Sequence, residues 1–174
     1  MSYFRLSTVI IFLISISISV WFVKNGFTET DVSQKDKSQV TDLIENFAGF
    51  GEPDQPGYSL KYRLSFSQEN SCHLVLIETT TINQGSTNKK ITTIKEFSLS
   101  SLNQNYKQIN SMGRELILYD VKNGNSITVK RKNSKLEDQE REILENSLGF
   151  HFEEKEDAIS FIKIFSKIMQ TCGG

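Results

Sequence analysis

The chain has 174 residues, which suits one domain with an appendage. A hydrophobic content of 37% with 12 phenylalanines can supply a packed core and disfavours a wholly disordered protein. The formal net charge of −1 provides no broad basic field, so we expect no nucleic-acid partner. The sequence also shows no catalytic or cofactor motif. The predictions that it allows therefore concern the location and the architecture of the protein.

The first predicted element is an N-terminal membrane helix. No charged residue occurs between Arg5 and Lys24. Although Ile and Ser alternate in the second half of the run as in a strand, residues 6–23 as a helix span about 27 Å. That length is close to the ~30 Å hydrocarbon core of a bilayer, whereas a strand of the same number of residues would be unusually long. Four residues mark the predicted segment: Leu6, Ile14, Trp21 and Val23.

Residues 1–24 are open to two main interpretations, a transmembrane anchor and a cleaved signal peptide. Arg5 supplies the basic start of a signal, and Ser17-Ile18-Ser19 is the best small-x-small cleavage candidate. Trp21 and Lys24 instead resemble the interfacial belt that ends a membrane span. A cytosolic core helix is the third alternative. Both export interpretations place the remaining chain outside the cytoplasm, either anchored to the membrane or released into an exported or periplasmic state.

Residues 25–57 are predicted to form a linker and a short amphipathic helix. Apolar residues at i, i+3, i+4 and i+7 predict the helix over 38–48. A joint rich in glycine and proline, GEPDQPG at 51–57, then separates this helix from the next segment.

Residues 58–174 are predicted to form a β-rich globular domain with a C-terminal helix. Residues 58–67 alternate apolar and polar side chains, as expected for a half-buried strand. Asn123-Gly124 predicts a β-hairpin between its two flanking strands, and the charged stretch 135–148 is predicted as a helix. The further strands are predicted at 72–82, 89–99, 106–111, 115–121, 126–132 and 149–152.

The last predicted element is the clearest helix in the sequence. Glutamate and aspartate residues within 153–157 crowd its N-terminus, where the helix dipole favours anions. Seven apolar residues at helical spacing form one continuous stripe: Ala158, Phe161, Ile162, Phe165, Ile168, Met169 and Cys172. We expect this stripe to cover the sheet.

Together these elements predict an α+β fold. An N-terminal membrane helix precedes a six- to seven-stranded antiparallel sandwich or partly open barrel, which a C-terminal amphipathic helix caps. The alternatives are a small open β-barrel and an α+β sheet with helices on one face.

Three stretches of the β-rich domain resemble the pleckstrin-homology-like architecture. They are KEFSLSSLN at 95–103, the Asn123-Gly124 hairpin and the helix-containing stretch at 152–172. The resemblance covers 58–172 and implies two packed antiparallel sheets capped by the C-terminal helix. Members that bind phosphoinositides carry basic residues in and beside the first strand-to-strand turn. Here that turn, SQENSC, contains Glu69 and no base, although Lys61 and Arg63 lie in the preceding strand.

Cys72 and Cys172 are the only cysteines. In an oxidising compartment an even pair is a candidate disulfide, which would join the start of a strand to the end of the C-terminal helix. The alternative is two buried free thiols, because cysteine is among the most buried residue types.

The remaining polar residues suggest no conventional site. His73 and His151 are the only histidines, and no four-ligand set of the kind that structural zinc requires is present. We therefore expect no cofactor and no metal. The leading functional hypothesis is a non-enzymatic binding module that is exported and tethered to a membrane, with a protein partner or an apolar ligand. Its rivals are an enzyme that uses residues such as Asp120, His151 and Glu153, and a small carrier with an apolar cavity between sheet and helix.

Overall fold

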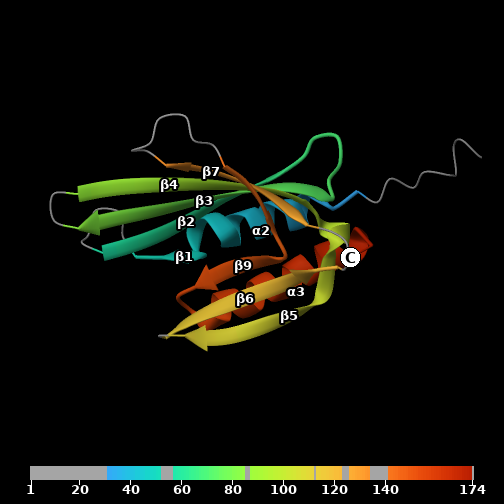
Figure 1. Ribbon diagram of the computed structural model, residues 1–174. Coiled ribbons are helices and arrows are strands. Elements are labelled where there is room, and N and C mark those ends of the chain that lie inside the picture. Colours follow the sequence, from blue (N-terminus) through green and yellow to red (C-terminus); the bar gives the residue numbers. More distant parts are fainter. Residues whose placement is uncertain are drawn as a thin grey trace, which may run out of the picture. The chain divides into compact units, whose positions relative to one another are not determined.

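The computed structural model (Figure 1) describes residues 31–51, 57–84, 87–111, 113–122, 126–133 and 141–173. The predicted membrane residues Leu6, Ile14, Trp21 and Val23 lie outside these ranges, as do the prediction of a signal peptide and the first part of the predicted linker. Within these ranges, no helix combines the length and the apolar character needed to cross a membrane.

The first described helix, α2 (Gln34–Asn46), begins four residues before the predicted start. The Ser33 side chain caps it by accepting a hydrogen bond from the backbone N–H of Asp36 at 3.1 Å. Val40 and Ile44 are fully buried, as the amphipathic pattern predicted, whereas Phe47, the last apolar residue of that pattern, follows the helix and is 47% exposed. At the end of α2, Gly49 turns the chain at a φ of 112°, where an added Cβ would collide with the Leu60 carbonyl oxygen.

Six strands form the larger sheet, in the order β1-β2-β3-β4-β7-β8. All neighbouring strands are antiparallel. In chain order they are β1 (Gly49–Phe50), β2 (Gly57–Phe66), β3 (His73–Gln84), β4 (Thr87–Ser98), β7 (Ile127–Asn133) and β8 (Arg141–Glu145). Figure 1 shows β2, β3 and β4 as long strands that run side by side.

Three antiparallel strands form the smaller sheet: β5 (Leu102–Ser111), β6 (Arg114–Val121) and β9 (Ser147–Phe152). A 3-10 turn, η1 (Leu99–Ser101), connects β4 to β5. Helix α3 (Lys155–Thr171) lies against this sheet and also contacts α2 (Figure 1). Its first turn contains Glu156 and Asp157, as the charge pattern predicted.

Aromatic rings fill the space between α3 and the smaller sheet. Phe161 and Phe165 from the helix meet Tyr119 from β6 and Phe150 from β9. The Phe150 and Phe161 ring centroids are 4.7 Å apart, and those of Tyr119 and Phe165 are 5.1 Å apart. Rings at these separations are in direct contact. This aromatic layer joins the core that also lies beneath the larger sheet.

The α+β class and the antiparallel strands are confirmed, but the predicted strand count is wrong. The described residues form nine strands in two open sheets, where six or seven strands in a sandwich or partly open barrel were expected. One reason is the stretch 141–148, which was predicted as part of a helix and forms β8 and the start of β9. Leu148 and Phe150 alternate into the core with period two, and pairing with β6 and β7 supplies their backbone hydrogen bonds. Residues 135–140 of the predicted helix lie outside the described ranges.

The predicted Asn123-Gly124 hairpin is also wrong. The strand before this dipeptide, β6, pairs with β5 and β9, whereas the strand after it, β7, pairs with β4 and β8. The chain therefore changes sheets between β6 and β7, and Asn123 and Gly124 themselves lie outside the described ranges. Pairing with β4 buries Ile127 and Val129 completely, and this burial outweighs the local preference of two turn residues.

Candidate functional site

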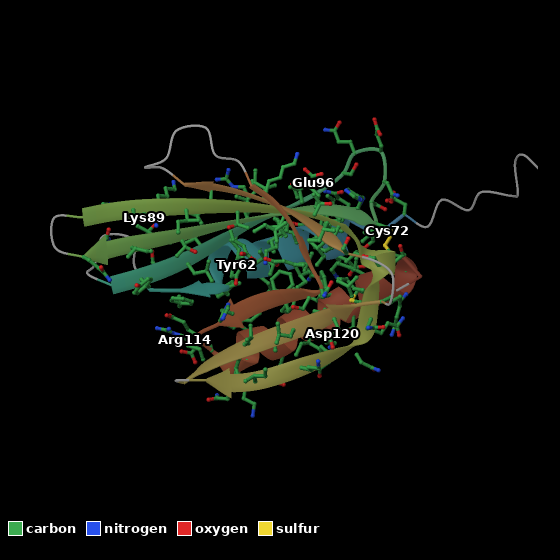
Figure 2. All side chains as sticks on the ribbon, viewed as in Figure 1. Tyr62, Cys72, Lys89, Glu96, Arg114 and Asp120 are labelled. Atoms are coloured by element: carbon green, nitrogen blue, oxygen red, sulfur yellow. A yellow bond between two sulfur atoms is a disulfide. The ribbon has the colours of Figure 1, made fainter. Side chains whose placement is uncertain are left out.

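Cys72 and Cys172 lie at bonding distance in the structure, and the bond is drawn in yellow in Figure 2. Their Cα atoms are 5.5 Å apart. Cys72 immediately precedes β3, and Cys172 ends α3. The Cys72 carbonyl also accepts a hydrogen bond from the Leu99 N–H at 2.9 Å. The pair therefore connects three elements at one end of the domain, namely β3, α3 and the turn that leads to the smaller sheet.

Of the three residues named for an enzymatic site, Asp120 and His151 lie apart. The carboxylate of Asp120 pairs with Lys107, at 2.6 Å. Glu153 accepts a hydrogen bond from the Gly51 N–H. His151 lies opposite Leu116 on β6, four positions from Asp120, which corresponds to roughly 13 Å along a strand. Each of the three has a separate structural partner.

His151 lies in a partly buried cluster between the two sheets. Its Nδ1 atom is 3.0 Å from the Tyr62 hydroxyl, and its ring packs edge-on against Phe50. The Arg114 guanidinium sits 4.3 Å from the centre of the same Phe50 ring. Burial lowers the pKa of His151, and the positive charges of Arg114 and Lys95 lower it further. The site therefore favours a neutral imidazole.

This pKa direction predicts a pH-dependent stability. Because the folded-state pKa of His151 lies below its unfolded value of about 6.5, the unfolded chain binds more protons as the pH falls through that value. We expect the free energy of unfolding, from urea melts, to be lower at pH 5.5 than at pH 7.5, and His151→Gln to reduce the difference. His73→Gln removes the other imidazole as the matched control; an equal effect of both variants would contradict the prediction.

Sequence reasoning missed a second charged cluster, around Lys95 on the inner face of the larger sheet. The Lys95 ammonium is 2.8 Å from a carboxylate oxygen of Glu78 and 2.9 Å from one of Glu145. Burial on its own would lower the pKa of Lys95, but the two carboxylates outweigh it and the net shift is upward. Lys95 lies in register with Leu76 and Val129, both core residues. The local sequence does not reveal that the Lys95 side chain points into the core, whereas the strand register does.

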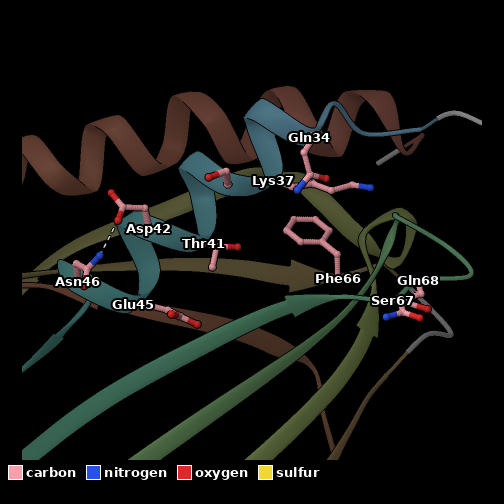
Figure 3. Close-up of a pocket in the computed structure, with 10 residues that line it drawn as sticks. Gln34, Lys37, Thr41, Asp42, Glu45, Asn46, Phe66, Ser67 and Gln68 are labelled. Atoms are coloured by element: carbon pink, nitrogen blue, oxygen red, sulfur yellow. Dashed lines mark hydrogen bonds between the residues drawn. The ribbon is translucent and has the colours of Figure 1, made fainter.

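Two hollows flank the C-terminal end of α2, and both are lined by Glu45 and Asn46. The first, of about 580 Å³, lies between α2 and the β2–β3 turn (Figure 3). The Phe66 ring points towards α2 there, and the Lys37 ammonium is 5.9 Å from its centre. Along the rim of this hollow, the side-chain amide of Asn46 donates a hydrogen bond to the Asp42 carboxylate at 2.6 Å.

The second hollow, of about 730 Å³, lies on the outer face of β2, β3 and β4. Lys61 and Arg63 enter it from β2, and Lys90 enters it from β4. Threonine side chains of β3 and β4 lie between these cations: Thr79, Thr81 and Thr92. Three cations and neutral hydroxyl groups therefore share one solvent-facing surface, which we call the basic hollow.

Comparison of the chain with protein-family models, with curated proteins and with solved structures finds no match.

Proposed function

We propose that the chain is an exported binding module that a membrane anchor tethers and that works without catalysis. The observation that carries the proposal is the pairing of Cys72 with Cys172 across a sequence separation of 100 residues. Disulfides form and persist in oxidising compartments and are rare in the cytosol. The uncharged run 6–23 supplies the corresponding export segment.

The arrangement of polar residues supports binding over catalysis. Asp120, His151 and Glu153 each have a separate partner. The larger sheet, in contrast, presents an outer face with a hollow of about 730 Å³ lined by polar and charged side chains. A scaffold of this kind can hold a ligand on a preformed surface.

The packed interior disfavours the alternative of a small apolar-ligand carrier. That function requires a sizeable apolar cavity between sheet and helix, whereas Tyr119, Phe150, Phe161 and Phe165 occupy this space with ring centroids 4.7–6.5 Å apart. The two hollows described above lie at the surface and carry polar groups.

Fractionation of cells that express the full chain with a C-terminal tag tests this proposal. We expect the chain in the membrane pellet after a high-salt wash, a tag that protease removes from outside the cytoplasm, and two cysteines that react with maleimide only after reduction. Free thiols or a protease-protected tag would contradict export.

Mass analysis of the mature N-terminus separates the anchor from the signal peptide. An intact N-terminus supports tethering, whereas a new terminus after Ser19 would overturn it and leave export standing. Ile14→Lys places a charge in the predicted span, at a cost of ~3 kcal/mol for insertion, and should release the chain from the membrane. Ile14→Leu is the matched control and should remain in the pellet.

A further inference from the structure

We infer that the basic hollow binds an anionic polysaccharide. This inference rests on the proposed binding function and names the class of ligand. Lys61, Arg63 and Lys90 would hold the acidic groups of the polymer, and the threonines between them would meet its hydroxyl groups.

The strand register places these side chains on one face. Lys61 lies opposite Thr79, which lies opposite Thr92, and Thr81 lies opposite Lys90. Directly paired residues of an antiparallel sheet point to the same side, and so do residues two positions apart on one strand. Lys61 and Arg63 therefore share a face with Lys90, and Lys130, in register with Ile94, continues that face onto β7.

Two cations of this face, Lys61 and Arg63, have no acidic partner among the described residues, and both side chains are exposed. The lysines at 37, 95, 107 and 167 behave differently, since each of them pairs with an acid. Glu45, at the α2 side, is the single acid among the residues that line the basic hollow.

The spacing of the cations favours a polymer over a small anion. Lys61 and Lys90 lie on strands two positions apart in the sheet and are offset by two residues along the strands, a separation of roughly 12 Å. Lys61 and Arg63 are two residues apart on one strand, or about 7 Å. A ligand that reaches all three cations needs several acidic groups along an extended chain.

The neutral residues favour a sugar polymer over other polyanions. Threonine hydroxyls lie between the cations, the Asn88 amide lies next to Lys90, and both kinds of group can donate and accept hydrogen bonds. Single-stranded nucleic acid would require exposed aromatic rings for its bases to stack on. Among the residues that line the basic hollow, the one aromatic residue is Tyr62, whose ring is buried. A recess also suits a flexible chain better than the plane of a lipid surface.

A binding assay with the full chain in detergent tests the inference. The probes are alginate, which carries carboxylates, dextran sulfate, and neutral dextran of matched length. We expect binding to at least one of the two anionic polymers, weakening as NaCl rises from 50 to 200 mM, and no binding to neutral dextran. The triple variant Lys61→Gln/Arg63→Gln/Lys90→Gln should lower the affinity at least tenfold.

The matched control removes the same total charge elsewhere, as Lys35→Gln/Lys155→Gln/Lys163→Gln on exposed helix positions. Equal weakening by both triple variants would contradict a defined site, as would tighter binding of single-stranded DNA or anionic vesicles through the same three residues. If the chain is exported and tethered but neither anionic polymer binds, this inference is wrong and the proposed function stands. A chain found in the cytoplasm would instead contradict the proposed function.

Discussion

Removal of the disulfide, by Cys72→Ala/Cys172→Ala, is expected to lower the free energy of unfolding by about 3–5 kcal/mol. The bond closes a loop with a sequence separation of 100 residues, and the entropy that the unfolded chain gains when such a loop opens stabilises the unfolded state by about that amount. For a domain of this length the loss corresponds to a melting temperature lower by roughly 10 °C. Thermal melts followed by circular dichroism, with and without a reductant, measure it.

The single variants sharpen this test. Cys72→Ala alone breaks the same bond, so its melting temperature should match that of the double variant and should no longer respond to reductant. Two single-variant effects that add up would mean that each cysteine stabilises the fold through packing on its own. A wild-type melting temperature that reductant leaves unchanged would contradict a bonded pair.

The sequence predicted those elements that carry a strong pattern of their own. The stripe of α3 was found because its apolar residues recur with helical spacing, and the structure buries Phe161, Phe165 and Ile168 as expected. Strand β2 was found because its side chains alternate, and Tyr62 and Leu64 indeed point inward. In both elements the burial of one face decides the conformation. The spacing of apolar residues along the sequence therefore predicts which face is buried.

The errors occur where distant pairing decides the conformation. The stretch 135–148 is rich in charged residues, and Leu136, Ile143 and Leu144 fall on one side of a helix, so the local pattern alone predicted a helix. Its strands exist because β6 and β7 offer backbone partners that no local window reveals. The Asn123-Gly124 dipeptide fits a hairpin locally, but its flanking strands find their partners in different sheets.

The candidate site was only partly visible in the sequence for the same reason. Lys61 and Arg63 stood out as bases in the first long strand, but their proximity to Lys90 depends on the register of three strands. The pairing of Tyr62 with His151 joins residues 89 positions apart. The resemblance to pleckstrin-homology-like proteins stays a prediction, and the structure shows two antiparallel sheets with α3 against the smaller one.

Loss of the Lys95 ammonium is expected to destabilise the domain strongly. Lys95→Met leaves Glu78 and Glu145 facing each other in a partly buried site without the cation that now lies within 3 Å of both. Removal of one partner from a buried ion pair costs about 3–5 kcal/mol, and the partial exposure of Glu145 favours the lower end. Urea unfolding at pH 7.5 measures the loss. Lys95→Arg keeps the charge and is the matched control.

The pH dependence of the stability deficit of Lys95→Met distinguishes charge repulsion from lost packing. In the Lys95→Met variant the carboxylates of Glu78 and Glu145 repel each other without the cation between them, and protonation of either one relieves this repulsion. The folded variant then binds protons more readily than the unfolded chain, and its deficit relative to wild type should shrink as the pH falls towards 5. Lys95→Met/Glu78→Gln/Glu145→Gln should recover most of the lost stability at pH 7.5, because no uncompensated charge remains. A deficit that is independent of pH and persists in the triple variant would show that Lys95 acts through its packed aliphatic chain instead.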